Sequence, residues 1–343
     1  MEVRANGRPL AVEVPVPRGD EDVRISVPIP AWFEGEVSVI ASHALASSEA
    51  ATLRVRRDSL PPPPKPKLFV ISIGAAQLAM NQSALLAASP SSPLQTKDRF
   101  QDLEFAAQDA QKVVSMLAAQ RGKAFSEVQE TVLLNEKATT AALRQAVQGV
   151  AAKAELGDVL LFFFSGHGNH DPKTGKFHLV THDTDPKREA ETAFSGEELS
   201  QLLGQVRGYV VVALDACHSG AVLGMQQGEK YKAPPLDISG LANQLSSAEH
   251  GIVMLSSSTP DEVSFEDREL GSGLFTKALL EGLEGKAAKD GTVTFRGLLD
   301  WLGTRVTELA SDGQPPADGA TSPAQTPVTV MPAGVPDFVI ARP

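Results

Sequence analysis

The only cysteine of this 343-residue chain and one of its seven histidines each follow an uninterrupted apolar segment. Residues 159–164 lead into Ser-Gly-His-Gly, which contains His167, and residues 209–214 lead into Asp-Ala-Cys-His-Ser-Gly, which contains Cys217. A thiol is mostly protonated at neutral pH, because its pKa is about 8.5, and a nearby imidazole can take its proton. The same imidazole can then protonate a leaving amine. The pair therefore predicts a nucleophilic dyad that cleaves amide bonds.

The glycines that flank both residues fit this chemistry. Glycine permits tight turns and lets a substrate backbone come close. The backbone N–H groups of Gly168 and Cys217 could together hold the oxyanion that develops during attack. A structural interpretation also stands for each residue alone, because free cysteine is among the most buried residue types and a histidine beside glycines is commonly a loop residue.

The elements that must position the two motifs can be predicted from apolar patterns. Unbroken apolar strands alternate with amphipathic helices, which indicates a mostly parallel sheet covered on both faces. Ligands and chemistry in such sheets gather at the carboxyl ends of the strands, where both motifs lie. The predicted strands are 68–73, 131–134, 159–164, 209–214 and 252–255, and the predicted helices are 103–118, 139–154, one that opens with the capping box 195–198, 273–283 and 295–309.

The first 59 residues have a different pattern. Apolar residues recur at every second position around 12–14, 23–27, 37–39 and 53–55, which predicts about four short antiparallel strands, resembling half of an immunoglobulin-like sandwich. Residues 60–67 are rich in proline and predict a stiff linker. We therefore divide the chain into a small β-rich segment (1–59), the linker (60–67) and an α/β domain (68–343) with a mobile connection near 223–248.

Composition limits the possible partners and the location. The 31 basic and 42 acidic side chains give a net charge of −11, which argues against nucleic acid as a partner. Neither a signal peptide nor an apolar run long enough to span a membrane is present in the sequence, so we expect a cytoplasmic protein that does not bind membranes. One cysteine allows no intrachain disulfide.

The two motifs together resemble the paired signatures of the caspase-like cysteine peptidases (peptidase C14-like), closest to bacterial caspase-family proteins and metacaspases. The spacing of 50 residues from His167 to Cys217 fits the caspase pattern. Residues 103–117 resemble the first helix of the family, and Leu-Phe-Thr at 274–276 resembles its small-subunit part. The resemblance extends over residues 68 to about 341. It implies a caspase-like α/β/α sandwich, a dyad of His167 and Cys217, and an oxyanion hole formed by Gly168 and Cys217.

The resemblance also implies a specificity. Asp215 stands two residues before the nucleophile, where metacaspases have Asp and animal caspases have Gln, and Asp109 corresponds to a second metacaspase acid in the first helix. Two carboxylates would pair with a guanidinium or ammonium group and repel an acidic side chain. We therefore expect a protein or peptide substrate cut after Arg or Lys, with Ser165 adding a hydrogen bond to the pocket. Alternatively, Asp109 lies on a solvated helix face, and Asp215 orients the Cys217 loop through backbone N–H groups.

By the same resemblance, residues 223–248 correspond to the linker between subunits. Lys230 and Lys232 lie within it and are candidate sites of self-cleavage, unless they only add charge for solubility. The metacaspase-like acids favour a monomer, and the N-terminal segment would dock a partner or act as a spacer. The alternative function is a catalytically silent caspase-like interaction module in a signalling or defence pathway.

Metal sites are the remaining chemical alternative, and we expect no cofactor. Proline and glycine near the histidine-rich stretch argue against a helix and indicate a hairpin, so the spacing fits zinc poorly. Some metacaspases need calcium, but two carboxylates fall short of the six to eight oxygens that Ca²⁺ takes. The residues considered for zinc are His167, His170, Asp171, His178 and His182, and those for calcium are Asp183 and Asp185.

Overall fold

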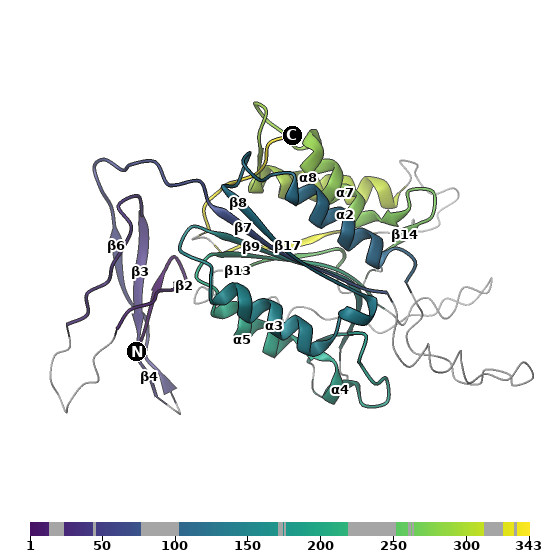
Figure 1. Ribbon diagram of the computed structural model, residues 1–343, viewed down its shortest axis with the longest axis horizontal. Helices are drawn as coiled ribbons and strands as arrows, with labels where there is room; N and C mark the ends of the chain where they lie inside the picture. Colours follow the sequence, from purple (N-terminus) through teal and green to yellow (C-terminus); the bar gives the residue numbers. More distant parts are fainter. Residues whose placement is uncertain are drawn as a thin grey trace, which may run out of the picture.

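Two separate sheets organise the protein in the computed structural model (Figure 1). At His170, Cys217 and His218 the backbone alone is described. The structure describes residues 1–13, 24–43, 46–76, 103–170, 174, 176–218, 252–259, 262, 264–311, 325–332 and 335–343.

The larger sheet has a parallel centre. Its central strands run in the order β8-β7-β9-β12-β13, all parallel, and β17 adds an antiparallel edge beside β13. Where β7 ends, β10 takes its place beside the last residues of β9, and β11 pairs with β10. The strands are β7 Lys67–Ala75, β8 Glu127–Leu134, β9 Val159–His170, β10 Phe177–Leu179, β11 Phe194–Ser195, β12 Tyr209–His218, β13 Ile252–Ser256 and β17 Val328–Val330.

Helices cover both faces of this sheet (Figure 1). One face carries α2, α7 and α8, and the opposite face carries α3 and α5. Each face has its own apolar core, in which alternate residues of the central strands point to opposite sides. The helices are α2 Ala106–Ala118, η1 Asn135–Lys137, α3 Thr140–Ala151, α4 Glu189–Thr192, α5 Gly196–Gly204, α7 Leu274–Glu281, the π-helix η3 Gly282–Lys286 and α8 Phe295–Ala310. The predicted three-layer α/β/α sandwich is therefore confirmed.

Short polar signals set the ends of the helices. Thr139 caps α3 by accepting a hydrogen bond from the backbone of Ala142. Ser195 caps α5 in the same way from Glu198, at the start of the predicted capping box. The predicted start of the first helix is wrong by three residues, since α2 begins at Ala106. Short two-stranded pairs complete the domain: β14 Glu266–Asp267 with β15 Ser272–Gly273, and β16 Val293–Thr294 with β18 Val339–Ala341.

The smaller sheet contains four antiparallel strands, but two of them differ from the prediction. Residues 12–13 and 24–27 form no strand, and Pro28 and Pro30, which follow the second of these segments, lack the backbone donors that a strand there would need. Two of the four strands instead come from the first nine residues, where Asn6 and Gly7 have positive φ angles of 48° and 77° and close a tight hairpin. The order is β2-β1-β3-β6, with β1 Glu2–Ala5, β2 Arg8–Pro9, β3 Gly35–Ile40 and β6 Ala51–Val55; β4 Ser42–His43 and β5 Ala46–Ser47 pair separately.

Arg8 fastens the smaller sheet to the α/β domain. Its side chain is fully buried, and it donates hydrogen bonds to the carbonyls of Leu203 (2.7 Å) and Val206 (2.9 Å) at the end of α5. A cation at the carboxyl end of a helix gives its last carbonyls a further donor and interacts favourably with the helix dipole. Burial, followed by the charge of Arg4, lowers the pKa of Arg8 to about 9. The contact lies where β12 is about to begin, at the opposite end of that strand from Cys217.

Helix length and hydrophobicity give no indication of a membrane span. Within the described residues, no helix is both long enough and apolar enough to cross a bilayer.

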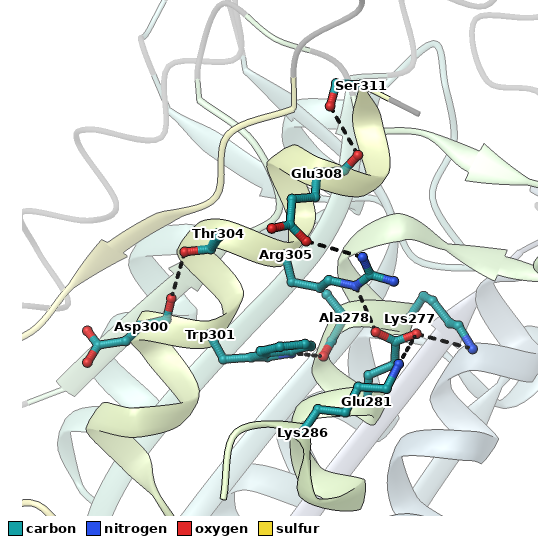
Figure 2. Close-up of polar contacts among 10 residues, drawn as sticks. All are labelled: Lys277, Ala278, Glu281, Lys286, Asp300, Trp301, Thr304, Arg305, Glu308 and Ser311. Atoms are coloured by element: carbon teal, nitrogen blue, oxygen red, sulfur yellow. Dashed lines mark hydrogen bonds and ion pairs between the residues drawn. The ribbon is translucent and has the colours of Figure 1, made fainter. Parts of the chain in front are cut away.

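A buried carboxylate joins α7 to α8 (Figure 2). Glu281, only 5% exposed, receives a hydrogen bond from Arg305 (2.8 Å) and lies 3.0 Å from the ammonium of Lys286 and 3.8 Å from that of Lys277. Burial raises its pKa, but the hydrogen bonds and charges of Arg305 and Lys286 outweigh that effect, so the pKa lies below its ordinary value. Beside it, the indole of Trp301 donates to the carbonyl of Ala278 at 2.9 Å.

We expect Glu281→Gln to lower the free energy of unfolding by about 1 to 3 kcal/mol at neutral pH, because a neutral amide leaves the surrounding cations without their partner. The depressed pKa means that this stability is present at neutral pH and disappears as the pH falls through the folded-state pKa. Urea denaturation at several pH values measures both effects. The control Glu308→Gln, an exposed partner of the same Arg305, should cost less than about 1 kcal/mol; equal losses in the two variants would contradict the argument.

Candidate active site

The pairing of β9 with β12 brings the two sequence motifs together. These parallel strands are in register over ten residue pairs, and the last four pairs join residues 165–168 to residues 215–218. His167 is the direct partner of Cys217, and Ser165 is the direct partner of Asp215. Because neighbouring strands lie about 4.8 Å apart, the backbones of His167 and Cys217 are adjacent at the carboxyl ends of the central strands.

The His-containing motif lies in a strand, whereas the sequence indicates a turn there. The apolar run ends at Phe164, but β9 continues to His170 because β10 pairs with it from the other side. The ring of His167 is 4% exposed, and its backbone carbonyl accepts a hydrogen bond from Val180 at 2.9 Å. His167 therefore belongs to the ordered sheet.

Packing explains why glycines flank His167. A Cβ atom at Gly166 would lie 2.7 Å from the ring of Phe164, and one at Gly168 would lie 3.0 Å from the ring of Phe177. These distances are too short for a side chain, so the rings would have to move. The glycines therefore let the strand continue beneath the aromatic rings.

The two predicted pocket acids, Asp109 and Asp215, lie on either side of one backbone segment. Asp109 is 1% exposed, and its two oxygens accept hydrogen bonds from the hydroxyl of Ser272 (2.6 Å) and the backbone of Gly273 (2.8 Å). Asp215 is 5% exposed, and its Oδ2 accepts from the hydroxyl of Thr276 at 2.6 Å. A Cβ atom on Gly273 would lie 2.8 Å from Asp215 Oδ2 and 3.5 Å from Asp109 Oδ2. The interpretation of Asp109 as a solvated helix residue is therefore wrong.

Burial makes both carboxylates resist ionisation. Burial, together with the charges of Asp109 and Glu266, raises the pKa of Asp215 to about 7 despite the hydrogen bond from Thr276. Burial also raises the pKa of Asp109, against hydrogen bonds from Ser272 and Gly273 and the charge of Lys112. The ammonium of Lys112 lies 3.7 Å from Asp109 and donates to the carbonyl of Gly271 at 2.6 Å. In the described structure, this site thus contains three acids (Asp109, Asp215 and Glu266) and one cation (Lys112).

Sequence reasoning missed the residues that hold these acids in place. Glu266 accepts hydrogen bonds from the backbones of Glu104 and Phe105, both at 3.1 Å, and so caps the start of α2. Ser272, Gly273 and Thr276 bind the two aspartates. The Gly-Ser-Gly sequence before the helical pattern of 274–281 was the only local signal, because an isolated Glu or Thr carries no pattern of its own.

Several predicted roles remain open in the structure. Ser165 is 5% exposed and neighbours Asp215 in register, which is compatible with the hydrogen bond predicted for it. Gly168 and Cys217 lie on adjacent strands with a register offset of one residue. Lys230 and Lys232 lie outside the described residues.

The residues considered for metal binding form no metal cluster within the described part of the chain. The predicted hairpin is confirmed, since β9 and β10 pair antiparallel. Asp183 accepts hydrogen bonds from Thr140 and Thr181, and Asp185 accepts from the backbone of Lys187, so both carboxylates hold turns. Asp171 lies outside the described residues.

Comparison with known proteins gives a consistent picture. The caspase domain family matches residues 96–329 of this chain. The crystal structure of protein GSU0716 from Geobacter sulfurreducens superposes with a TM-score of 0.51 at 20% identity, covering 79% of this chain and 95% of that one, which shows a shared fold. A structure of pro-sf-caspase-1 aligns with a TM-score of 0.42 at 14% identity, covering 84% of this chain and 99% of that one. No curated protein matches the sequence.

The raised pKa of Asp215 predicts a pH-dependent stability. The folded protein binds a proton at Asp215 more tightly than the unfolded chain does, so stability falls as the pH rises from about 4 to about 7 and levels off above that. Asp215→Asn keeps the acceptor for Thr276 and removes the charge. As the pH rises from 5 to 8, we expect the free energy of unfolding of Asp215→Asn to increase by about 3 kcal/mol relative to that of the wild type.

Thermal and urea denaturation across this range measure the difference. Asp300→Asn on α8, whose carboxylate points away from the labelled neighbours in Figure 2, is the control and should show no such trend. A constant difference between the Asp215 variant and the wild type would refute the raised pKa.

Proposed function

Because this chain belongs to the caspase domain family, we propose that it is a cysteine endopeptidase in which Cys217 is the nucleophile and His167 the base. The observation that supports the assignment is the register of β9 and β12, in which the two residues are direct partners at the carboxyl ends of the strands. Family membership supports a peptidase of protein substrates, and the identity of the dyad, the specificity and the activation are parts of the proposal.

The proposed reaction follows from the chemistry of the two side chains. The imidazole of His167 takes the thiol proton as the sulfur of Cys217 attacks the carbonyl carbon of the scissile bond. The backbone N–H groups of Gly168 and Cys217 hold the resulting oxyanion. As the C–N bond breaks, the imidazolium of His167 gives its proton to the leaving amine, and water later hydrolyses the thioester.

Cleavage after Arg or Lys is the second part of the proposal. Asp109, Asp215 and Glu266 gather around Gly273, and Lys112 is the cation found near them in the described structure. A substrate guanidinium or ammonium would offset the excess negative charge, whereas an acidic side chain would add to it. Asp215 is the direct neighbour of Ser165 and lies two residues before Cys217, so a basic side chain bound there precedes the cut.

Further parts of the proposal concern activation and partners. Lys230 and Lys232 would be cut by the peptidase itself, and no cofactor is required, although calcium dependence stays open. We propose that the protein acts as a monomer in the cytoplasm and that the N-terminal sheet docks a partner. The exposed edge strand β6, where Leu53 is 67% exposed, is compatible with that docking role.

The dyad can be tested with two single variants. Cys217→Ala and His167→Ala should each reduce hydrolysis of a fluorogenic peptide amide at least about 1,000-fold, because members of a catalytic unit fail together. Circular dichroism and thermal melting check that both variants fold. Mass spectrometry should find fragments ending at Lys230 or Lys232 in the wild type and an intact chain in Cys217→Ala. Equal rates in the wild type and both variants would instead support a catalytically silent interaction module.

Specificity can be tested with a library of peptides that differ only before the scissile bond. We expect Arg and Lys peptides to exceed Asp peptides at least about 100-fold in kcat/KM, since like charges repel in a buried site. Asp215→Asn should reduce that preference, mainly through KM. A wild-type enzyme that prefers Asp peptides would refute the proposed preference for Arg and Lys and would leave the proposed dyad unaffected.

A further inference from the structure

Thr276 contacts Asp215 directly through a short hydrogen bond. Its side chain is fully buried in the first turn of α7, and its hydroxyl donates to Asp215 Oδ2 at 2.6 Å. The backbone amide of Thr276 also lowers the pKa of the same carboxylate. One residue thus acts twice on the acid that stands two positions before Cys217.

Thr276 lowers the pKa of Asp215, whereas the negative charges around Asp215 raise it. Asp109 on α2 and Glu266 on β14 both disfavour a second negative charge there, and Lys112 on α2 lies beside Asp109. Strand β9 contributes Ser165 directly opposite and His167 two residues further along. Directly after strand β13, the neutral Ser257 donates its backbone N–H to the carbonyl of Leu214 at 2.9 Å. Within the described residues, the hydroxyl and the backbone amide of Thr276 therefore oppose burial and like charge at Asp215.

The position of α7 makes this contact rigid. Helix α7 begins with Thr276 in its first turn and ends with Glu281, which is held by cations from α7, η3 and α8 (Figure 2). Gly273 lies directly before α7 and its N–H binds Asp109. The hydroxyl of Thr276 is therefore positioned beside Asp215 by a helix that is anchored at both ends.

We propose that Thr276 is a specificity-positioning residue: its hydroxyl holds the carboxylate of Asp215 in its ionised, oriented form and so sets the pH above which the enzyme recognises Arg or Lys. This inference rests on the proposed function. A donor bonded to a carboxylate favours the charged form, so removing the hydroxyl makes Asp215 ionise at a higher pH. A substrate cation then finds a neutral acid where it needs an anion.

The test compares Thr276→Val, which keeps the shape but loses the hydroxyl, with Thr276→Ser, which keeps the hydroxyl. We measure kcat/KM for an Arg peptide amide from pH 5 to pH 9. For the valine variant, the acidic limb should move up by about one pH unit, with about a tenfold loss near pH 6.5 that falls mainly on KM and disappears at pH 9. The serine variant should retain the wild-type profile. Thr304→Val, at an exposed hydroxyl on α8, is the matched control.

A binding measurement separates this shift from titration of the dyad. Benzamidine carries a fixed positive charge, and calorimetry with the full-length Cys217→Ala protein follows its binding without any thiol chemistry. Adding Thr276→Val should weaken binding about tenfold near pH 6.5 and leave it unchanged at pH 9. An unmoved limb and unchanged binding in a valine variant that still melts normally would overturn the inference. A wild type that cleaves no basic peptide would instead refute the proposed function.

Discussion

The parallel pairing of β9 with β12 is the constraint on which the candidate site depends. Ten consecutive residues of each strand are paired, and the pairing continues four residues past the apolar segments that form the core. A slip of one residue would separate His167 from Cys217 and turn the buried side chains of both strands to the wrong face. The apolar residues of both strands fill two cores at once, so the same packing that stabilises the sheet also fixes the alignment of the two motifs.

The acidic cluster beside these strands costs stability that the rest of the domain must supply. Asp109 and Asp215 are both buried beside Gly273, and burial raises the pKa of both. Natural proteins retain such unfavourable arrangements mainly where function uses them. The helix pair α7–α8 offsets part of the cost through Glu281 and its cations, at the other end of α7 from Thr276. Stability and recognition are therefore divided between the two ends of α7.

The sequence predicts the fold well where a hydrophobic pattern is repeated along the chain. Unbroken apolar runs and 3.6-residue periodicity locate the central strands and the main helices, and Thr139 and Ser195 mark helix starts. The candidate site is predicted as far as its motifs reach, and the register of His167 with Cys217 agrees with that prediction. The roles of Glu266 and Thr276 could not be predicted, because they depend on tertiary neighbours and leave no local sequence pattern. The N-terminal strands are misplaced because alternation in 24–27 competes with the prolines that follow.

The attachment of the smaller sheet bears on how the site is kept open to substrate. Arg8 binds the end of α5, at the opposite end of the central strands from His167. A fully buried guanidinium is costly unless its donors are satisfied, so the two carbonyls and Arg8 favour one geometry between the sheets. The N-terminal sheet can therefore pack firmly on the α/β domain without covering the carboxyl ends of β9 and β12. A partner bound to its exposed strand β6 would therefore be separated from the candidate dyad of His167 and Cys217 by the central strands.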